Sequence, residues 1–317
     1  MNLFIRLIKT LIMWFSLAVI LILIILLPRN TESYRDGNDD VMSYQFTWDS
    51  YKDNVIEYIS NVWSNKSIGI TNYNQTFETE LIRYGTRTLF VFVPALLLSI
   101  VFGIYKGVFD YRHRTGLWRV IGQGGTWVTQ SVPDFFLILL IQLLLSMLHR
   151  WGLPQIDLYG DEHWYNFILP ALFLSMYPAA LIARYTTEYL ENEEYADYIK
   201  TAEAKGVPEK SILWNHVLRN CWTKLIQHFL PITLTLVSSM FVVEYMTMYN
   251  GMGTRLIKAI QIKDSIIPGQ SLPIDIPVVI GFSLIFMFIF MIVQLISQIL
   301  LHVLSPVRGE GLVDEER

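Results

Sequence analysis

Residues 276–301 read IPVVIGFSLIFMFIFMIVQLISQILL and contain no charged side chain. A helix needs about 20 apolar residues to cross the hydrocarbon of a bilayer. Because lipid offers no hydrogen-bond partners, a segment of this length must satisfy its own backbone groups and therefore forms a helix. The stretch is therefore a predicted membrane-spanning helix, and it indicates an integral membrane protein.

Five further segments have the same apolar character. They are 10–28, 88–105, 120–148, 165–183 and 225–243. The only ionisable side chains within them are Asp134 and His228. The whole chain is 53% hydrophobic and 16% charged, whereas a soluble domain carries about 25% charged residues. The sequence therefore predicts an all-α membrane protein with six transmembrane helices.

Loop charges predict the side of the membrane that each connection faces. The connection 106–119 carries four basic residues and one acidic residue, whereas 149–164 carries Arg150 against three carboxylates. Short loops rich in Lys and Arg stay in the cytoplasm, so both termini are predicted to be cytoplasmic. Arg6 and Lys9 precede the first span, and no small-residue cleavage site follows it. We therefore expect an uncleaved helix rather than a signal peptide.

These assignments divide the chain into four predicted parts. Residues 1–28 form an N-terminal transmembrane helix, and 29–87 form a small extracellular cap. Residues 88–304 form a five-helix core that contains a cytoplasmic loop at 194–220, and 305–317 form a cytoplasmic tail.

The cytoplasmic loop reads EYADYIKTAEAKGVPEKSILWNHVLRN and has the pattern of two short helices around a tight turn. Gly206 suits the left-handed position just past the end of a helix, and Pro208 suits the first turn of the next one. Ile212, Leu213 and the pair 217–218 predict one apolar face on the second helix. On physical grounds alone, the unit either docks a protein partner or packs on its own bundle as an ordinary linker.

The same loop resembles the "EAA" loop of binding-protein-dependent ABC importers, and most closely that of the oligopeptide, dipeptide and nickel permeases. The resemblance implies that the loop docks on an ATPase subunit. The residues at matching positions are Asp197, Thr201, Ala202, Glu203, Ala204, Lys205, Gly206, Ile212, Arg219 and Asn220.

The resemblance extends over roughly residues 83–308 and adds candidates for the translocation path or gate. These candidates are Ser131, Pro133, Asp134, Glu244, Gly251 and Gly253. An acidic residue at membrane depth is costly and tends to face a cavity or a partner. Two other interpretations stay open, namely that Asp134 caps the kink at Pro133 and that Glu244 anchors its helix at the membrane interface.

The resemblance also implies the fold, the partners and the location. It implies a type I ABC importer-like permease in the bacterial cell membrane, surrounded by lipid and paired with a homologous second permease. Two ABC ATPase subunits, which hold ATP and Mg, and an extracellular solute-binding lipoprotein complete the expected assembly. Peptides are the expected cargo, and no cofactor is expected on this chain itself.

Some positions depart from the family pattern. Lys224 stands where proline is usual, and about eleven extra residues lie within 263–274. The extra residues are on the predicted external side, so they bear on the cargo rather than on the ATPase contact.

Two functions of other classes compete with this interpretation. A self-contained secondary transporter or channel needs intramembrane ion-coupling residues and usually an internal repeat, and the sequence offers few such residues and no visible repeat. A membrane sensor would bind its ligand at the cap and signal through the loop. The sequence has no P-loop or protease motif, no metal spacing, a single cysteine and no basic bias towards nucleic acid, so we expect no catalysis by this chain.

Overall fold

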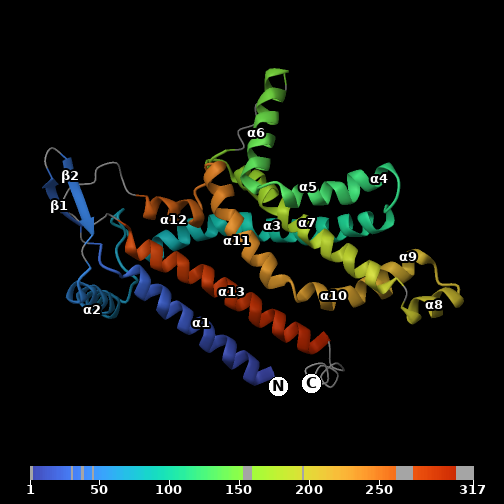
Figure 1. Ribbon diagram of the computed structural model, residues 1–317, viewed down its shortest axis with the longest axis horizontal. Helices are drawn as coiled ribbons and strands as arrows, with labels where there is room; N and C mark the ends of the chain where they lie inside the picture. Colours follow the sequence, from blue (N-terminus) through green and yellow to red (C-terminus); the bar gives the residue numbers. More distant parts are fainter. Residues whose placement is uncertain are drawn as a thin grey trace. The chain divides into compact units, whose positions relative to one another are not determined.

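The computed structural model describes residues 3–29, 31–36, 39–44, 46–152, 159–194, 196–261 and 274–304. The predicted tail and the extra segment 263–273 lie outside these described residues. The elements of Figure 1 follow in this order: α1 (Leu3–Ile25), β1 (Thr31–Asp36), β2 (Asp39–Tyr44), α2 (Trp48–Asn65), α3 (Phe77–Arg112), α4 (Leu117–Arg119), a π-helix (Val120–Gly124), α5 (Gly125–Ser131), α6 (Asp134–Arg150), a 3-10 helix (Trp164–Phe167), α7 (Ile168–Glu193), α8 (Asp197–Ala204), α9 (Glu209–Ser211), a second π-helix (Ile212–Val217), α10 (Leu218–Ile226), α11 (Phe229–Met246), α12 (Met252–Ile260) and α13 (Ile276–Leu304).

The predicted all-α membrane fold is confirmed, with one addition and one correction. Among the described residues, five helical segments are long and apolar enough to cross a membrane, and a bent pair of helices brings the number to six. The addition is an antiparallel hairpin in the cap, in which β1 pairs with β2 from Thr31 opposite Tyr44 to Asp36 opposite Asp39.

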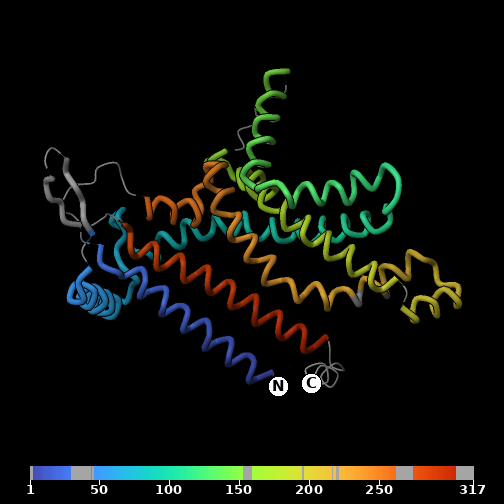
Figure 2. Tube along the Cα trace, in the orientation of Figure 1, coloured from blue at the N-terminus to red at the C-terminus, as the bar shows by residue number. Residues whose placement is uncertain are grey.

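The correction concerns the third predicted span, 120–148, which is not one helix. It consists of Leu117–Ser131 and Asp134–Arg150, which are bent by 112° at the break. Figure 2 shows α6 leaving α5 steeply at this point. Pro133 has no N–H to donate, and its ring disfavours a helical conformation at the residue before it. Accordingly, Val132 is extended, with φ −94° and ψ 130°.

The chain divides into two compact units, which we describe separately. Unit 1 comprises 1–7, 90–249 and 290–317, and unit 2 comprises 8–89 and 250–289. In unit 1, α7 packs against α5, α10 and α11. Half of the residues of α7 are buried, including Leu174, Ala183 and Leu190. This helix is therefore the core of unit 1.

Two glycines allow α3 to approach α7 closely within unit 1. A Cβ atom at Gly103 would lie 2.9 Å from the carbonyl oxygen of Ala179, and one at Gly107 would lie 2.7 Å from that of Ala183. The hydroxyl of Thr187 donates to the carbonyl oxygen of Gly107 at 3.1 Å. Small residues four apart commonly permit such close packing between membrane helices.

Unit 2 is built around a buried ionic cluster. The guanidinium of Arg255 on α12 donates to both carboxylate oxygens of Glu80 on α3, at 2.7 and 3.1 Å. It also donates to Asp275 at 2.5 Å, and it lies over the ring of Tyr73 at 4.4 Å. Asp275 further accepts from the backbone N–H of Asn72 at 3.1 Å. The cluster thus joins the starts of α3 and α13 to α12 and the loop before α3.

Replacing Gly107 with alanine should destabilise the protein, because the new Cβ would collide with the backbone of α7. The matched control is Gly125→Ala, which is also helical but has no atom within 4 Å of the added Cβ. Alanine is favoured over glycine in a helix by about 1 kcal/mol, so the control should be neutral or stabilising. Thermal unfolding in detergent, followed by tryptophan fluorescence, measures both. Equal unfolding temperatures for the two variants would contradict the close packing.

Replacing Arg255 with methionine should destabilise unit 2 severely, because it leaves two carboxylates buried without their cation. Breaking a buried ion pair in this way costs roughly 3–5 kcal/mol. Lys258→Met on the same helix is the control, since the one contact of Lys258 with the described residues is an exposed hydrogen bond to Asn250. The yield of monodisperse protein and its unfolding temperature report the difference. A harmless Arg255→Met would show that the cluster does not hold the unit together.

Candidate functional site

The first helix of the 194–220 segment has five exposed and three partly exposed residues. It is α8, Asp197–Ala204, and none of its residues is buried. The carboxylate of Asp197 lies in its first turn, where the helix dipole favours negative charge. Asp197 forms an exposed ion pair with Lys200 at 3.2 Å, and the hydroxyl of Thr201 donates to the Asp197 carbonyl oxygen at 2.9 Å. Of the predicted contact residues on this helix, Glu203 and Ala204 are therefore exposed, and Ala202 is partly exposed.

The turn after α8 is a complete Schellman motif, which is one of the common ways for a helix to end. The backbone N–H of Gly206 donates to Glu203 at 2.9 Å, and that of Val207 donates to Ala202 at 3.1 Å. Lys205 caps the helix and Gly206 has φ +72°. L-residues avoid this left-handed region, whereas glycine adopts it freely. The predicted left-handed conformation of Gly206 is confirmed.

The second half of the segment differs from the expected plain helix. Pro208 precedes the short α9, and the chain then forms a π-helix over Ile212–Val217 before α10. In a π-helix each N–H reaches five residues back, so residues five apart lie above one another. This places Ile212 over Val217 and Leu213 over Leu218, and all four are buried. The spacing of five agrees with a π-helix but does not by itself distinguish it from the plain helix that the sequence predicts.

Two acidic residues at the end of α7 anchor this segment within unit 1. Glu193 accepts from Lys224 at 3.0 Å and from the hydroxyl of Tyr198 at 2.9 Å. Glu194 accepts two hydrogen bonds from Arg114, at 2.9 and 2.8 Å. These hydrogen bonds hold the pKa of Glu194 below its ordinary value. Lys224, the departure from the family pattern, therefore connects α10 to the end of α7.

The remaining predicted site residues are placed as follows. Arg219 and Asn220 lie in α10, and their side chains are outside the described part of the structure. Ser131 ends α5 and is exposed, and Pro133 precedes α6. Gly251 and Gly253 belong to unit 2, at the start of α12.

The two acidic residues predicted for the path lie on different helices of unit 1. Asp134 is the first residue of α6, and its carboxylate accepts a hydrogen bond from the hydroxyl of Ser239 on α11. The contact therefore bridges two helices. A local cap at the Pro133 kink, which was one of the expected roles of Asp134, would not involve α11. Glu244 lies near the end of α11 and is fully buried.

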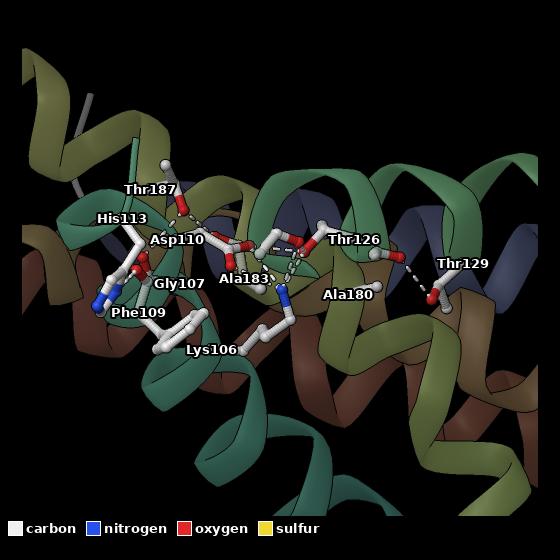
Figure 3. A network of polar contacts seen from close by, with 12 residues as sticks. Lys106, Gly107, Phe109, Asp110, His113, Thr126, Thr129, Ala180, Ala183 and Thr187 are labelled. Carbon is white, nitrogen blue, oxygen red and sulfur yellow. Dashed lines mark hydrogen bonds and ion pairs between the residues drawn. The ribbon is translucent and has the colours of Figure 1, made fainter. Parts of the chain in front are cut away.

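A further polar network, which sequence analysis missed, lies between α3 and the start of α5. Figure 3 shows Lys106, Asp110 and Thr126 converging. The ammonium of Lys106 donates to both oxygens of Asp110 at 2.7 and 3.0 Å, to the carbonyl oxygen of Gly122 at 2.7 Å and to Thr126 at 2.9 Å. Thr126 in turn donates to Asp110 at 2.6 Å. Lys106 and Asp110 are four residues apart, a spacing that places them side by side on a helix. The sequence analysis assigns both to the connection 106–119, so their pairing was missed.

The network borders a cavity of about 590 Å³ in unit 1. Its lining residues are Phe102, Tyr105, Lys106, Phe109, Gly125, Thr126, Thr129, Met176, Ala179 and Ala180. Most of this wall is apolar, and Lys106 contributes its one charged group. Within the described part of the chain, no cluster of three or more His, Cys, Asp or Glu side chains is arranged to hold a metal ion.

Comparison with known proteins relates this chain to a family of transport proteins. Residues 88–307 match the model of a family described as "Binding-protein-dependent transport system inner membrane component". The glutathione transport system permease protein GsiC of Pectobacterium atrosepticum is 29% identical over 177 residues, which are 56% of each chain. The chain thus spans little more than half the length of this relative. A putative peptide permease of Brucella suis is 27% identical over 69% of this chain and 71% of its own.

A solved structure has the same fold. It is an inward-facing form of the MetNI methionine ABC transporter, with a TM-score of 0.53 and 17% identity over 71% of this chain and 95% of that one. At this identity the likeness concerns the fold alone. Because the family model covers more than half of the chain, the protein is a membrane-embedded member of the binding-protein-dependent transport system inner membrane component family.

Proposed function

We propose that this chain is the permease subunit of an ATP-driven ABC importer and that it forms the translocation path together with a homologous second permease. Two ABC ATPase subunits bind its cytoplasmic side and hydrolyse ATP with Mg. An extracellular solute-binding lipoprotein delivers the cargo. Both termini face the cytoplasm, as the loop charges predict.

The division of the 194–220 segment into an open half and an anchored half carries this proposal. Helix α8 has no buried residue, and its exposed side offers a surface that the described part of unit 1 leaves uncovered. The second half inserts Ile212, Leu213 and Val217 among buried residues, and Glu193 ties α10 to α7. A partner that binds α8 can therefore move the segment and, through it, the central helix of unit 1.

The mechanism that follows is alternating access. The two ATPase subunits close when ATP binds, because ATP has a higher affinity for their closed arrangement. Closure draws together the 194–220 segments of the two permeases. Through α7 and α10 this movement opens the bundle to the outside, where the binding protein releases its cargo. Hydrolysis then restores the inward-facing state.

We further propose peptides as the cargo class. The relatives named above are permeases for glutathione, itself a small peptide, and for peptides. We assign Ser131, Pro133 and Asp134, at the break before α6, to the path. Glu244 and the glycines 251 and 253 complete the proposed path and gate. A carboxylate within the membrane suits a cargo that carries an amino group.

Gly206→Val should uncouple transport while leaving the complex assembled. A β-branched residue at φ +72° costs about 1–2 kcal/mol, which lowers the population of this turn roughly 5–30-fold. Gly206→Asn should retain most activity, because asparagine tolerates the left-handed region better. The measurements are peptide uptake by cells and, in the purified complex, the ATPase stimulation caused by the binding protein.

The matched control is Gly116→Val. Gly116 has φ +74° and, like Gly206, has no atom within 4 Å of an added Cβ, but it lies outside the 194–220 segment. Its ψ of −163° lies in a region that only glycine adopts readily, so the substitution should carry at least as much backbone strain and still keep its coupling. Normal uptake by Gly206→Val in a complex that retains its ATPase subunits would refute the role of this turn.

A further inference from the structure

The helix α2 presents an apolar stripe that the described residues of unit 2 leave open. Trp48, Ile56, Ile59 and Trp63 are 59–86% exposed. Their spacing (48, 56, 59 and 63) places them on one face of a helix with 3.6 residues per turn. Lys52 lies within the same stripe. One large exposed apolar residue needs no explanation, but an aligned group of four indicates an interaction surface.

The other two faces of α2 have different characters. Tyr51, Val55, Tyr58 and Val62 share the partly buried face, beside the apolar stripe. The opposite face carries Asp49, Asp53, Glu57, Ser60 and Ser64, all of them exposed. The helix is therefore amphipathic, and its apolar side includes both the packed face and the open stripe.

Two hydrogen bonds hold α2 at the end of α1. The hydroxyl of Tyr51 donates to the carbonyl oxygen of Leu23 at 3.1 Å, and the amide of Asn54 donates to that of Leu26 at 3.2 Å. Both acceptors are at the end of α1, a predicted span whose one buried residue is Thr10. In Figure 1, α2 is seen nearly along its own axis at the end of α1, whose axis lies across the view. The helix therefore crosses the end of a membrane span.

Aromatic side chains gather at the same level. Phe46 packs edge-on against Trp48, with ring centroids 5.2 Å apart, and Tyr51 lies 6.2 Å from Trp48. Tryptophan and tyrosine are enriched where membrane and water meet, because their rings are apolar and their N–H or O–H groups are polar. A lysine within an apolar stripe can lay its aliphatic chain on lipid and extend its ammonium to the headgroups.

We propose that α2 lies in the plane of the membrane as an interfacial helix, with the Trp48, Ile56, Ile59 and Trp63 stripe in the lipid of the headgroup and acyl boundary. Such helices bury their apolar face about 5–10 Å into this boundary. In this placement the acidic face points into water. Because that face is negative, insertion depends on apolar burial and not on anionic lipid.

Spin labels on the two faces of α2 test this placement. The full-length permease is reconstituted in phosphatidylcholine nanodiscs with a nitroxide at Ile59→Cys or Trp63→Cys, and at Asp53→Cys or Glu57→Cys as matched controls. Cys221, the one native cysteine, is buried, and burial raises its pKa to about 11, so the label goes to the introduced thiol. Collisions with oxygen, which enters lipid, are compared with those of a nickel chelate, which stays in water.

We expect oxygen collisions to exceed nickel collisions at positions 59 and 63 and the reverse at 53 and 57. Equal exposure to the nickel chelate at all four positions would overturn the proposal. So would protection of 59 and 63 from both reagents, since this would mean that protein covers the stripe, for example the binding protein. The test needs no nucleotide, cargo or ATPase subunit, so its result is independent of the proposed importer function.

Discussion

A bilayer core offers no hydrogen-bond partner to a peptide group, and every described element of the membrane-spanning part can be traced to this constraint. The constraint explains why the apolar segments are helices and why the departures from regular helix are accompanied by polar contacts. At the break before α6, Asp134 accepts from Ser239 on another helix. At the π-helix that leads into α5, the carbonyl oxygen of Gly122 accepts from Lys106. Both polar contacts bridge neighbouring helices, so they also determine how unit 1 is assembled.

Inside the membrane, the apolar surface of lipid and that of a neighbouring helix are nearly equivalent, so close packing has to supply the specificity. Gly103 and Gly107 provide it by bringing α3 against α7. Unit 2 uses charge instead, since Arg255 joins Glu80 and Asp275 in a buried cluster. Such a cluster is not a net source of stability by itself, but it tolerates no missing partner. The two units are thus held by different interactions, and the same kind of substitution should have unequal consequences in each.

Features that depend on local chain chemistry could be predicted from the sequence. Long apolar runs gave the spans, and Gly206 and Pro208 gave the turn, because a left-handed residue and a helix start each need a particular residue type. Features that depend on contacts between distant residues could not. Arg255 meets Glu80 across 175 positions, and the pairing leaves no local pattern. A kink at Pro133 was expected in the third span, but the size of the bend, 112°, could not be predicted.

The 194–220 segment shows the same distinction within a single site. Its composition indicated two helices and an apolar face, but the π-helix that aligns Ile212 with Val217 became evident only from the backbone. Its anchoring by Glu193 and Glu194 depends on residues that precede the matched motif. The resemblance to the coupling loop therefore identified which residues could contact a partner, and the structure explains how they are held.

The central claim is that α8 is the surface that receives an ATPase subunit. The most direct measurement is to place a photo-crosslinking amino acid at the exposed Glu203 and, as a control, at the exposed Glu57 on α2. The complex is irradiated in native membranes, and the products are identified by mass spectrometry. The account predicts a crosslink from position 203 to a P-loop ATPase and none to that protein from position 57. Crosslinks from position 203 only to this chain itself would contradict it and would make the segment an internal linker.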